Sequence, residues 1–271
     1  MKFGICSEIF KEWNDIERTI AYVKETGYDG LEIAPFTFAD YVYDITVADR
    51  KNIVRSAEKY ELDILGIHWV FVGPDNVHLT HLDTEVRTTT QKYLEDLVNF
   101  CADVGGKVII FGSPKQRSLM DGVSYSQAFE FARSVFEKTM ARCELQDVTI
   151  CMEPLTHLET DFCHTTAQAV DLIEAVDHPN FQLILDTKAM TFELDSRAAL
   201  IKKYAHYLKH FHANDENLHG PGFGDVDFAP IFEALKSIGY EDYVSVEVFN
   251  FEPGPECIAK NSLQYMKQFV Q

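Results

Sequence analysis

Short apolar segments recur along the chain, and each is followed by a longer amphipathic segment. Most of the short segments are too uniformly apolar to alternate between a buried and an exposed face, which is typical of parallel strands covered on both sides. They predict eight strands, over Lys2–Cys6, Gly30–Ile33, Asp63–His68, Lys107–Phe111, Val148–Glu153, Gln182–Asp186, Lys209–His212 and Tyr243–Val248.

The segments between these strands predict amphipathic helices that each place one apolar stripe against a sheet. Ile16, Ile20 and Val23, for example, fall at i, i+4 and i+7, and the same spacing returns in later segments. Several of these segments stop at a glycine, as at Gly27 and Gly239, which is typical of a left-handed helix C-cap followed by a short loop.

Eight strands that alternate with eight helices, without a break in composition, predict an α/β fold. The fold we expect is a single (β/α)8 TIM barrel over residues 1–271. The competing architecture is an open, doubly wound sheet, which would usually carry a Gly-x-Gly-x-x-Gly turn after its first strand. Here the first strand runs into Cys6-Ser7-Glu8-Ile9-Phe10, so we favour the barrel.

The chain is strongly acidic, which narrows the classes of partner. It has 24 Lys and Arg residues against 43 Asp and Glu residues, a formal net charge of −19. Such a surface repels phosphate backbones and anionic lipids, so we expect a small-molecule substrate, no nucleic acid and no membrane, while homo-oligomer formation stays open. The six cysteines form no Cys-x-x-Cys pair, and we find no signal peptide or membrane span, so we expect a cytoplasmic protein.

Ionisable residues stand at the ends of four consecutive predicted strands. In a TIM barrel the carboxyl ends of the strands share one rim, and catalytic residues lie there. Glu153, Asp186, His212 and Glu247 occupy this position in strands five to eight. Any one of these acids could equally cap a helix or pair with a lysine, but their recurrence on successive strands favours a common site.

Three carboxylates and one imidazole at close range need a counter-ion, because like charges in a confined space repel. Mostly oxygen ligands with one nitrogen suit a six-coordinate Mn²⁺, Mg²⁺ or Co²⁺ better than a tetrahedral structural Zn²⁺. We therefore predict one divalent metal ion, Mn²⁺ by preference, on these four residues. Two coordination positions stay open for substrate oxygens, such as those of a vicinal hydroxy-ketone. We expect His210 to point away from His212 and to be structural.

Further residues near the same rim are candidate substrate-binding groups. His68 and Trp69 end the third predicted strand, where a histidine can exchange a proton and an aromatic ring can cover an apolar group. Lys115 and Arg117 follow the fourth strand and suit a carboxylate, a phosphate or sugar hydroxyls. Lys188, next to a predicted metal ligand, could touch substrate or pair with a rim acid. Each of these residues could instead be structural or simply solvated.

With these residues in place, the chain resembles the xylose-isomerase-like TIM-barrel superfamily, and within it the sugar isomerase and epimerase group that includes the ketose 3-epimerases. The resemblance extends over the whole chain, and its motifs are specific from Glu153 onward. It implies that the four rim residues are metal ligands and that Glu153 and Glu247 also face each other across the substrate and shuttle protons. It further implies a substrate-side role for Glu159 and a family turn at Pro221–Gly224.

Two positions depart from the epimerase pattern. Ala189 stands where these enzymes carry a substrate-binding histidine, and Leu218 stands where they carry an arginine. The metal and proton-transfer residues are therefore retained while part of the substrate contacts is changed. We expect weak activity on the simple ketoses D-fructose and D-psicose, and better activity on a sugar or cyclitol that carries an extra charged or apolar group.

We interpret the chain as a divalent-metal-dependent sugar isomerase or epimerase that acts on a ketose or keto-sugar derivative. One glutamate removes the proton next to the carbonyl and the other returns it, through a cis-enediolate. A lyase or dehydratase on a keto sugar or keto-cyclitol, similar to inosose dehydratases or C-glycoside-cleaving enzymes, would begin with the same step and stays open. An apurinic-site endonuclease of the same superfamily is disfavoured by Ala189 and by the net charge of −19. A barrel that only binds ligands is disfavoured because all four metal ligands are present.

Overall fold

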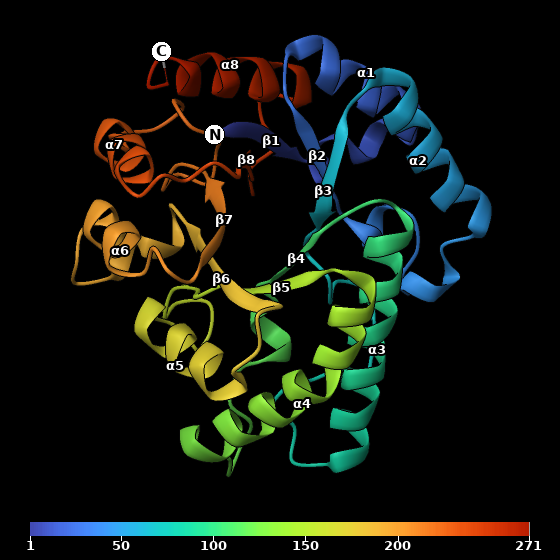
Figure 1. The fold of residues 1–271 in the computed structure, drawn as a ribbon, viewed down its shortest axis with the longest axis vertical. Coiled ribbons are helices and arrows are strands. Elements are labelled where there is room, and N and C mark those ends of the chain that lie inside the picture. The colour runs from blue at the N-terminus through green and yellow to red at the C-terminus, as the bar shows by residue number, and fades with distance from the viewer. Residues whose placement is uncertain (271) are drawn as a thin grey trace.

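The computed structural model describes residues 1–270 and contains a closed parallel barrel. Each strand pairs with the next strand of the chain, and the last pairs with the first, so the predicted (β/α)8 fold is confirmed. Helices surround the barrel (Figure 1). The strands are β1 (Lys2–Cys6), β2 (Gly30–Ile33), β3 (Asp63–Ile67), β4 (Val108–Phe111), β5 (Thr149–Met152), β6 (Phe181–Asp186), β7 (Leu208–Ala213) and β8 (Tyr243–Val246).

One α-helix follows each strand, and short 3₁₀ helices lie in several of the connections. The α-helices are α1 (Ile16–Thr26), α2 (Val47–Tyr60), α3 (Thr84–Asp103), α4 (Tyr125–Gln146), α5 (Thr166–Val176), α6 (Arg197–Lys203), α7 (Ala229–Ser237) and α8 (Pro255–Lys267). The 3₁₀ helices are η1 (Ser7–Trp13), η2 (Pro35–Thr37), η3 (Val42–Asp44), η4 (Pro114–Gln116) and η5 (Ala189–Phe192).

Polar caps and left-handed residues set the helix boundaries. The side chain of Thr46 accepts from the backbone N–H of Asp49 in a capping box at the start of α2. Gly27 ends α1 with a φ of 101°, as the sequence predicted, because only glycine adopts this conformation without strain. Gly239, after α7 and before β8, likewise adopts a left-handed conformation, with a φ of 69°. Local sequence therefore determines where each helix stops and the next strand begins.

The barrel interior is closed by side chains that pack over glycines. Leu65 on β3 fills the space beside Gly4 on β1 and Gly30 on β2, where a Cβ atom on either glycine would collide with it. Gly66, the next residue, lies so close to β4 that a Cβ atom would meet the carbonyl oxygen of Val108. Strands this closely packed are rigid supports for the residues at their carboxyl ends.

The strand register brings the predicted rim residues together. Asp186 ends β6 and is aligned with His212 on β7, and His212 is aligned with Ser245 on β8. Glu153 and Glu247 are the first residues after β5 and β8. The four side chains therefore leave neighbouring strands at the same end of the barrel.

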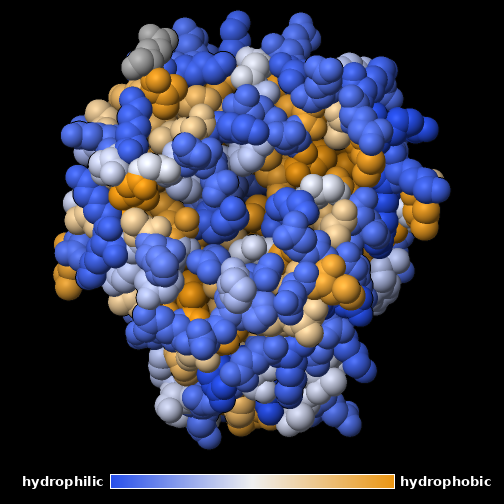
Figure 2. All heavy atoms as spheres, in the orientation of Figure 1, coloured by the Kyte–Doolittle hydropathy of each residue, from blue (hydrophilic) through white to orange (hydrophobic). Residues whose placement is uncertain are grey.

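The outer surface agrees with the acidic composition. Hydrophilic side chains cover most of the face seen in Figure 2, and hydrophobic side chains gather in smaller areas between them. Within residues 1–270, no helix has the length and apolar character that crossing a membrane requires.

We predict that Gly66→Ala strongly destabilises the barrel. The added methyl group meets a backbone oxygen rather than a side chain that can rotate away, so we expect a loss of about 3 kcal/mol or more in the free energy of unfolding. Gly239→Ala is the control, because a Cβ atom there meets nothing within 4 Å. Its left-handed backbone should cost only about 1–2 kcal/mol. Urea denaturation of both variants measures the difference, and equal stabilities would contradict this account of the packing.

Candidate active site

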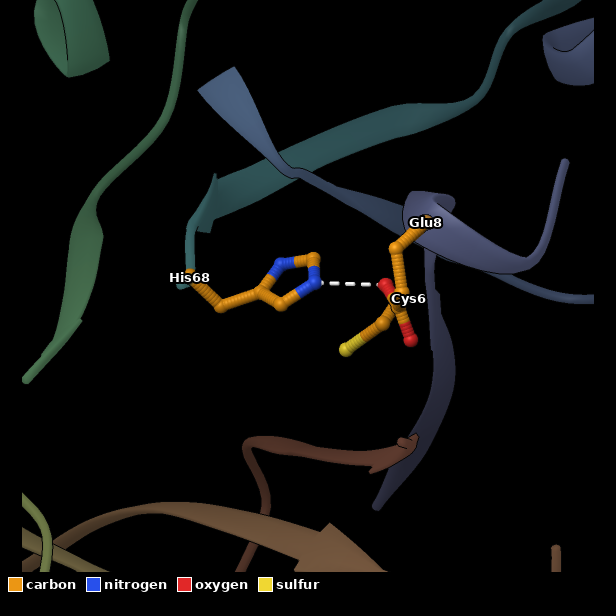
Figure 3. A group of neighbouring side chains, drawn as sticks. All are labelled: Cys6, Glu8 and His68. Atoms are coloured by element: carbon orange, nitrogen blue, oxygen red, sulfur yellow. Dashed lines mark hydrogen bonds and ion pairs between the residues drawn. The ribbon is translucent and has the colours of Figure 1, made fainter. Parts of the chain in front are cut away.

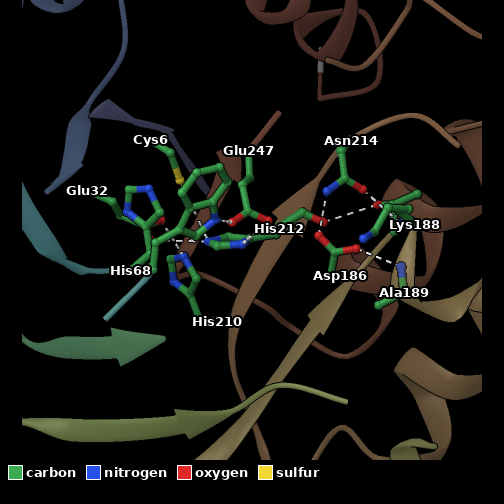
Figure 4. A network of polar contacts seen from close by, with 12 residues as sticks. Cys6, Glu32, His68, Asp186, Lys188, Ala189, His210, His212, Asn214 and Glu247 are labelled. Atoms are coloured by element: carbon green, nitrogen blue, oxygen red, sulfur yellow. Dashed lines mark hydrogen bonds and ion pairs between the residues drawn. The ribbon is translucent and has the colours of Figure 1, made fainter. Parts of the chain in front are cut away.

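Four ionisable side chains converge at the carboxyl end of the barrel. Glu153, Asp186, His212 and Glu247 each offer one ligand atom, and these atoms all lie within 4.8 Å of one another. All four side chains are buried, with exposed fractions of 5%, 0%, 0% and 2%. Figure 4 shows three of them, with Asp186, His212 and Glu247 at the centre of a polar network.

Asp186 is held in place from both sides of its carboxylate. The backbone N–H of Ala189 donates to Oδ1 at 2.7 Å, and the side-chain amide of Asn214 donates to Oδ2 at 2.5 Å. The Asn214 carbonyl oxygen in turn accepts from the backbone N–H of Lys188 at 2.8 Å. The residue after β7 therefore fixes the loop after β6, and Ala189 contributes through its backbone alone.

His212 uses its two ring nitrogens in different directions. Nδ1 lies 3.2 Å from Oε2 of Glu247, inside the cluster, and Nε2 lies 3.1 Å from Oε2 of Glu32 on β2. The second oxygen of Glu32 lies 2.7 Å from Nε2 of His210. In the tautomer with the proton on Nε2, Nε2–H donates to Glu32 and the lone pair of Nδ1 points into the cluster, which is the usual arrangement of a metal-binding histidine and its supporting carboxylate.

The expectation that His210 points away from His212 is wrong. Residues two apart on a strand lie on the same face, so both rings enter the barrel interior and both contact Glu32. His210 has no place among the four convergent residues, and its contact with Glu32 is a supporting one.

Glu247 and Glu153 have different surroundings. The indole N–H of Trp69 donates to Oε1 of Glu247 at 2.8 Å. Within residues 1–270, no protein group donates a hydrogen bond to the carboxylate of Glu153, whose backbone N–H donates to Phe111. That carboxylate lies where a Cβ atom on Gly112 would collide with it, so the glycine after β4 leaves it space.

Burial and crowding oppose the charged forms of two carboxylates of this cluster, Glu153 and Asp186. Burial raises the pKa of Glu153 well above its usual range, and the charges of Glu247 and Asp186 raise it further. Burial followed by the charge of Glu247 raises the pKa of Asp186 to about 6. Burial alone would lower the pKa of His212, but the charges of Glu32 and Glu247 outweigh it and raise the pKa. A compensating positive charge between these groups would relieve the conflict.

The donor set fits one divalent cation. Ligands on opposite sides of an ion, each about 2.0–2.2 Å away, stand about 4.0–4.4 Å apart, and the four ligand atoms lie within 4.8 Å of one another. Such an ion would satisfy the Glu153 carboxylate, which has no hydrogen-bond donor, and would lie between Nδ1 of His212 and the Glu247 carboxylate that Nδ1 now contacts. Three oxygen ligands and one nitrogen suit Mn²⁺, Mg²⁺ or Co²⁺.

A cavity of about 520 Å³ opens beside this cluster. Glu153 and Glu247 form part of its wall, and the rest comes mainly from the segments after β3 and β4, residues 69–75 and 110–116. Trp69, Lys115 and Glu159, three of the predicted substrate-binding residues, also line it. The cavity is therefore the space in which a substrate would meet both glutamates.

Lys188 and Glu159 form an ion pair at the edge of this cavity. Their Nζ and Oε1 atoms are 2.6 Å apart, and the Lys188 ammonium also lies 4.2 Å from the ring centroid of Phe249. The pairing of Lys188 with a rim acid, one of the alternatives that the sequence left open, is therefore present. The charge of each residue is therefore already paired with that of the other.

Arg117 lies behind the cavity and does not line it. Its side chain is fully buried, and its guanidinium donates to the backbone carbonyl oxygens of Glu153 at 2.6 Å and Cys163 at 3.2 Å. The short η4 helix and the left-handed Ser113, with a φ of 47°, turn the chain inward before this residue. The structure thus places Arg117 as a support for the backbone of Glu153, away from the position that a substrate contact requires.

His68 is also buried beneath the cavity wall. Its Nε2 atom lies 2.6 Å from Oε2 of Glu8, and Cys6 is close to both, as Figure 3 shows. Nδ1 of His68 and Oε1 of Glu8 have no hydrogen-bond partner among the described residues. The structure pairs His68 with an acid that follows β1 and does not bring it to the surface of the cavity.

Several supporting residues were not identified from the sequence. Glu8 and Asn214 both follow a barrel strand by two or fewer residues, and that position was a usable signal for each.

The carboxylate of Asp215 accepts from the backbone N–H groups of Gly222, Gly224 and Val226 at 3.0–3.2 Å. The turn at Pro221–Gly224 is therefore wrapped around an acidic side chain, which excludes it as a phosphate-binding loop.

Comparison with known proteins agrees with this architecture. The family model described as "Xylose isomerase-like TIM barrel" matches residues 20–269. The chain belongs to this family. The resemblance that was predicted from the rim residues is thus confirmed at the level of the family.

Its relatives in the family include sugar epimerases. The chain is 30% identical over 258 residues to the D-psicose 3-epimerase of Ruminiclostridium cellulolyticum, covering 92% of this chain and 84% of that protein. It is 26% identical over 280 residues to the 3-dehydro-D-guloside 4-epimerase of Escherichia coli, covering 98% and 99%. The crystal structure of the apo 3-keto-D-glucoside 4-epimerase from E. coli superposes with a TM-score of 0.86 at 23% identity, covering 99% of each chain, which shows the shared fold.

We predict that Asp186→Ala and His212→Ala each lose a bound divalent ion. Each substitution removes one ligand of a buried cluster, and the remaining three groups cannot complete the site. Elemental analysis of the protein purified in the presence of Mn²⁺ measures the ion. His206→Ala, a histidine replacement at an exposed position two residues before β7, is the control and should keep it. An unchanged metal content in both cluster variants would rule out these ligands.

Proposed function

We propose that the chain is a divalent-metal-dependent sugar epimerase that acts on a keto sugar. The observation that carries the proposal is that two glutamates of one cluster that could hold a metal ion, Glu153 and Glu247, line the same cavity. The relatives named for epimerisation at carbon 3 of ketoses and carbon 4 of a keto-glycoside support the same class of reaction. Both reactions invert a carbon next to a carbonyl group.

The reaction needs a proton to leave and return at one carbon. Glu153, Asp186, His212 and Glu247 would hold the divalent ion, which when bound would polarise the substrate carbonyl and make the neighbouring C–H more acidic. One glutamate carboxylate takes the proton, and the electron pair of the C–H bond moves to the carbonyl oxygen, giving an enediolate. The other glutamate, in its acid form, delivers a proton to the opposite face while the electron pair returns. The product has the same mass and one inverted centre.

The surrounding residues keep the two glutamates in different positions for this exchange. Trp69 holds one oxygen of Glu247, and Arg117 holds the backbone of Glu153. The donor-free carboxylate of Glu153, beside Gly112, has room to approach a substrate carbon.

We predict that Glu153→Gln and Glu247→Gln each lose about 10²–10⁴-fold in turnover, the usual contribution of general acid–base catalysis. An amide oxygen can still face the ion, but an amide cannot take up or deliver the proton. Glu241→Gln is the control, since Glu241 is an exposed glutamate two residues before β8. Metal content is measured in the same samples, so that lost chemistry is separated from a lost ion.

The assay follows a panel of keto sugars in D₂O by NMR and mass spectrometry. An epimer that gains one deuterium at the carbon next to the carbonyl supports the proposal. Loss of water or of an aglycone would identify a lyase instead, which begins with the same proton removal. Near-normal rates in either glutamine variant would mean that the residue is only a ligand.

A further inference from the structure

The cavity beside the two glutamates is larger than a free sugar requires. Its volume of about 520 Å³ lies within the range of about 300–1,000 Å³ typical of pockets for drug-sized ligands, and a free hexose has only about a dozen non-hydrogen atoms. The reacting carbons must lie at the end that contains Glu153 and Glu247. The remaining space extends away from this end, along the segments after β3 and β4.

One wall of this space is a stack of aromatic rings. Trp69 stacks on Phe36 with ring centroids 5.7 Å apart and on Phe249 with centroids 5.9 Å apart, at interplanar angles of 18° and 24°. Trp69 and Phe249 both line the cavity, and Trp69 is fixed by its bond to Glu247. A flat or apolar group of a ligand can therefore pack against the wall that begins at the catalytic end.

Apolar residues continue beyond the rings. Phe71, Val72, Pro74, Pro114 and Leu155 also line the cavity, and Val72 is 45% exposed although it is aliphatic. An exposed aliphatic side chain in a concave wall beside a catalytic centre is a candidate contact for an apolar ligand group.

The apolar wall is tied together by backbone and side-chain bonds. The amide of Gln116 donates to the carbonyl oxygen of Phe71 at 3.1 Å, which joins the segments after β3 and β4. The backbone N–H of Phe249 donates to Leu218 at 2.9 Å, which joins the loops after β7 and β8. The wall is therefore formed before any ligand enters, and little ordering cost opposes binding.

The charges around the cavity disfavour an anionic group. Asp75, Glu153, Glu159 and Glu247 line it against one cation, the exposed Lys115. The other two cations near the rim are already engaged, Lys188 by Glu159 and Arg117 by backbone carbonyls. Outside the four-residue cluster, Asp75 and Lys115 balance each other in charge and Glu159 is paired with Lys188, so the outer part of the cavity offers a phosphate or carboxylate no net positive charge.

We infer that the substrate is a keto sugar that carries a neutral, apolar substituent through a glycosidic bond, with an aromatic aglycone as the best fit. This inference rests on the proposed function. The keto sugar lies against the two glutamates, and the aglycone lies in the outer cavity against Trp69, Phe249 and Val72. The changed positions agree with it, since Leu218 directs its side chain outward, 42% exposed, and Ala189 offers only its backbone to Asp186.

The test compares one keto-glucose core with four different groups: the free sugar, its methyl glycoside, its phenyl glycoside and its 6-phosphate. For the metal-loaded wild-type protein, we expect kcat/KM for the phenyl glycoside to exceed that for the methyl glycoside about tenfold or more, since burying an aromatic ring is worth at least about 1.4 kcal/mol. The 6-phosphate should have a lower kcat/KM than either the methyl or the phenyl glycoside. Calorimetric titration with the two glycosides should show the same order of affinity.

Val72→Ser tests the location of the aglycone. We expect it to reduce the phenyl-to-methyl ratio of kcat/KM about threefold or more, because it replaces an aliphatic contact with a hydroxyl. Val47→Ser makes the same change at an exposed valine on α2, outside the cavity, and should leave the ratio unchanged.

The outcomes separate this inference from the proposed function. Equal kcat/KM values for the free sugar and the phenyl glycoside, or a preference for the phosphate, would overturn the inference while the epimerase proposal stands. An unchanged ratio in Val72→Ser would overturn the placement of the aglycone beside this residue. If none of the four compounds exchanges a proton with solvent, the proposed function itself fails.

Discussion

The structure depends on one electrostatic constraint: three carboxylates and an imidazole share a buried volume at the carboxyl end of a closed barrel. Such a group is costly unless its charges are balanced and its unused atoms are hydrogen-bonded. The neighbouring residues meet the second need. Asn214 and the backbone of Ala189 hold Asp186, while Trp69 holds Glu247. A divalent ion would meet the first need, and the same ion would supply the Lewis acid that a keto-sugar epimerase requires.

The support extends from strand to strand around the barrel. Glu32 on β2 reaches across the interior to His212 and His210 on β7, so the first half of the chain fixes the orientation of a ligand in the second half. Arg117, from the segment after β4, fixes the backbone of Glu153 after β5. Barrel closure makes these contacts possible, since residues about 180 positions apart in sequence become neighbours only when β8 pairs with β1.

The sequence predicted the fold and the four convergent residues because both follow from periodic constraints. Buried strands read as short apolar runs, and the carboxyl ends of parallel strands meet at one rim whatever the loops do. The direction in which a loop side chain points cannot be predicted from any such periodic pattern. Arg117 was expected at the substrate, but a left-handed Ser113 and a short 3₁₀ turn direct it inward. The position of Glu8 just after β1 marks it as a rim residue, but it lies in a 3₁₀ helix, where sequence periodicity does not show that its side chain turns toward His68.

Two different parts of the closed barrel supply the ionisable residues and the wall of the cavity. Strands β5 to β8 and the residues directly after them supply all four convergent ionisable residues, whereas most of the cavity wall comes from the segments after β3 and β4. Evolution can therefore exchange or lengthen those two segments, and so change which molecules enter the cavity, without moving any of the four convergent residues. Descendants of one such barrel can diversify in substrate range while their proton-transfer chemistry stays the same. The sequence differences that change the substrate range are then expected in the loops after β3 and β4.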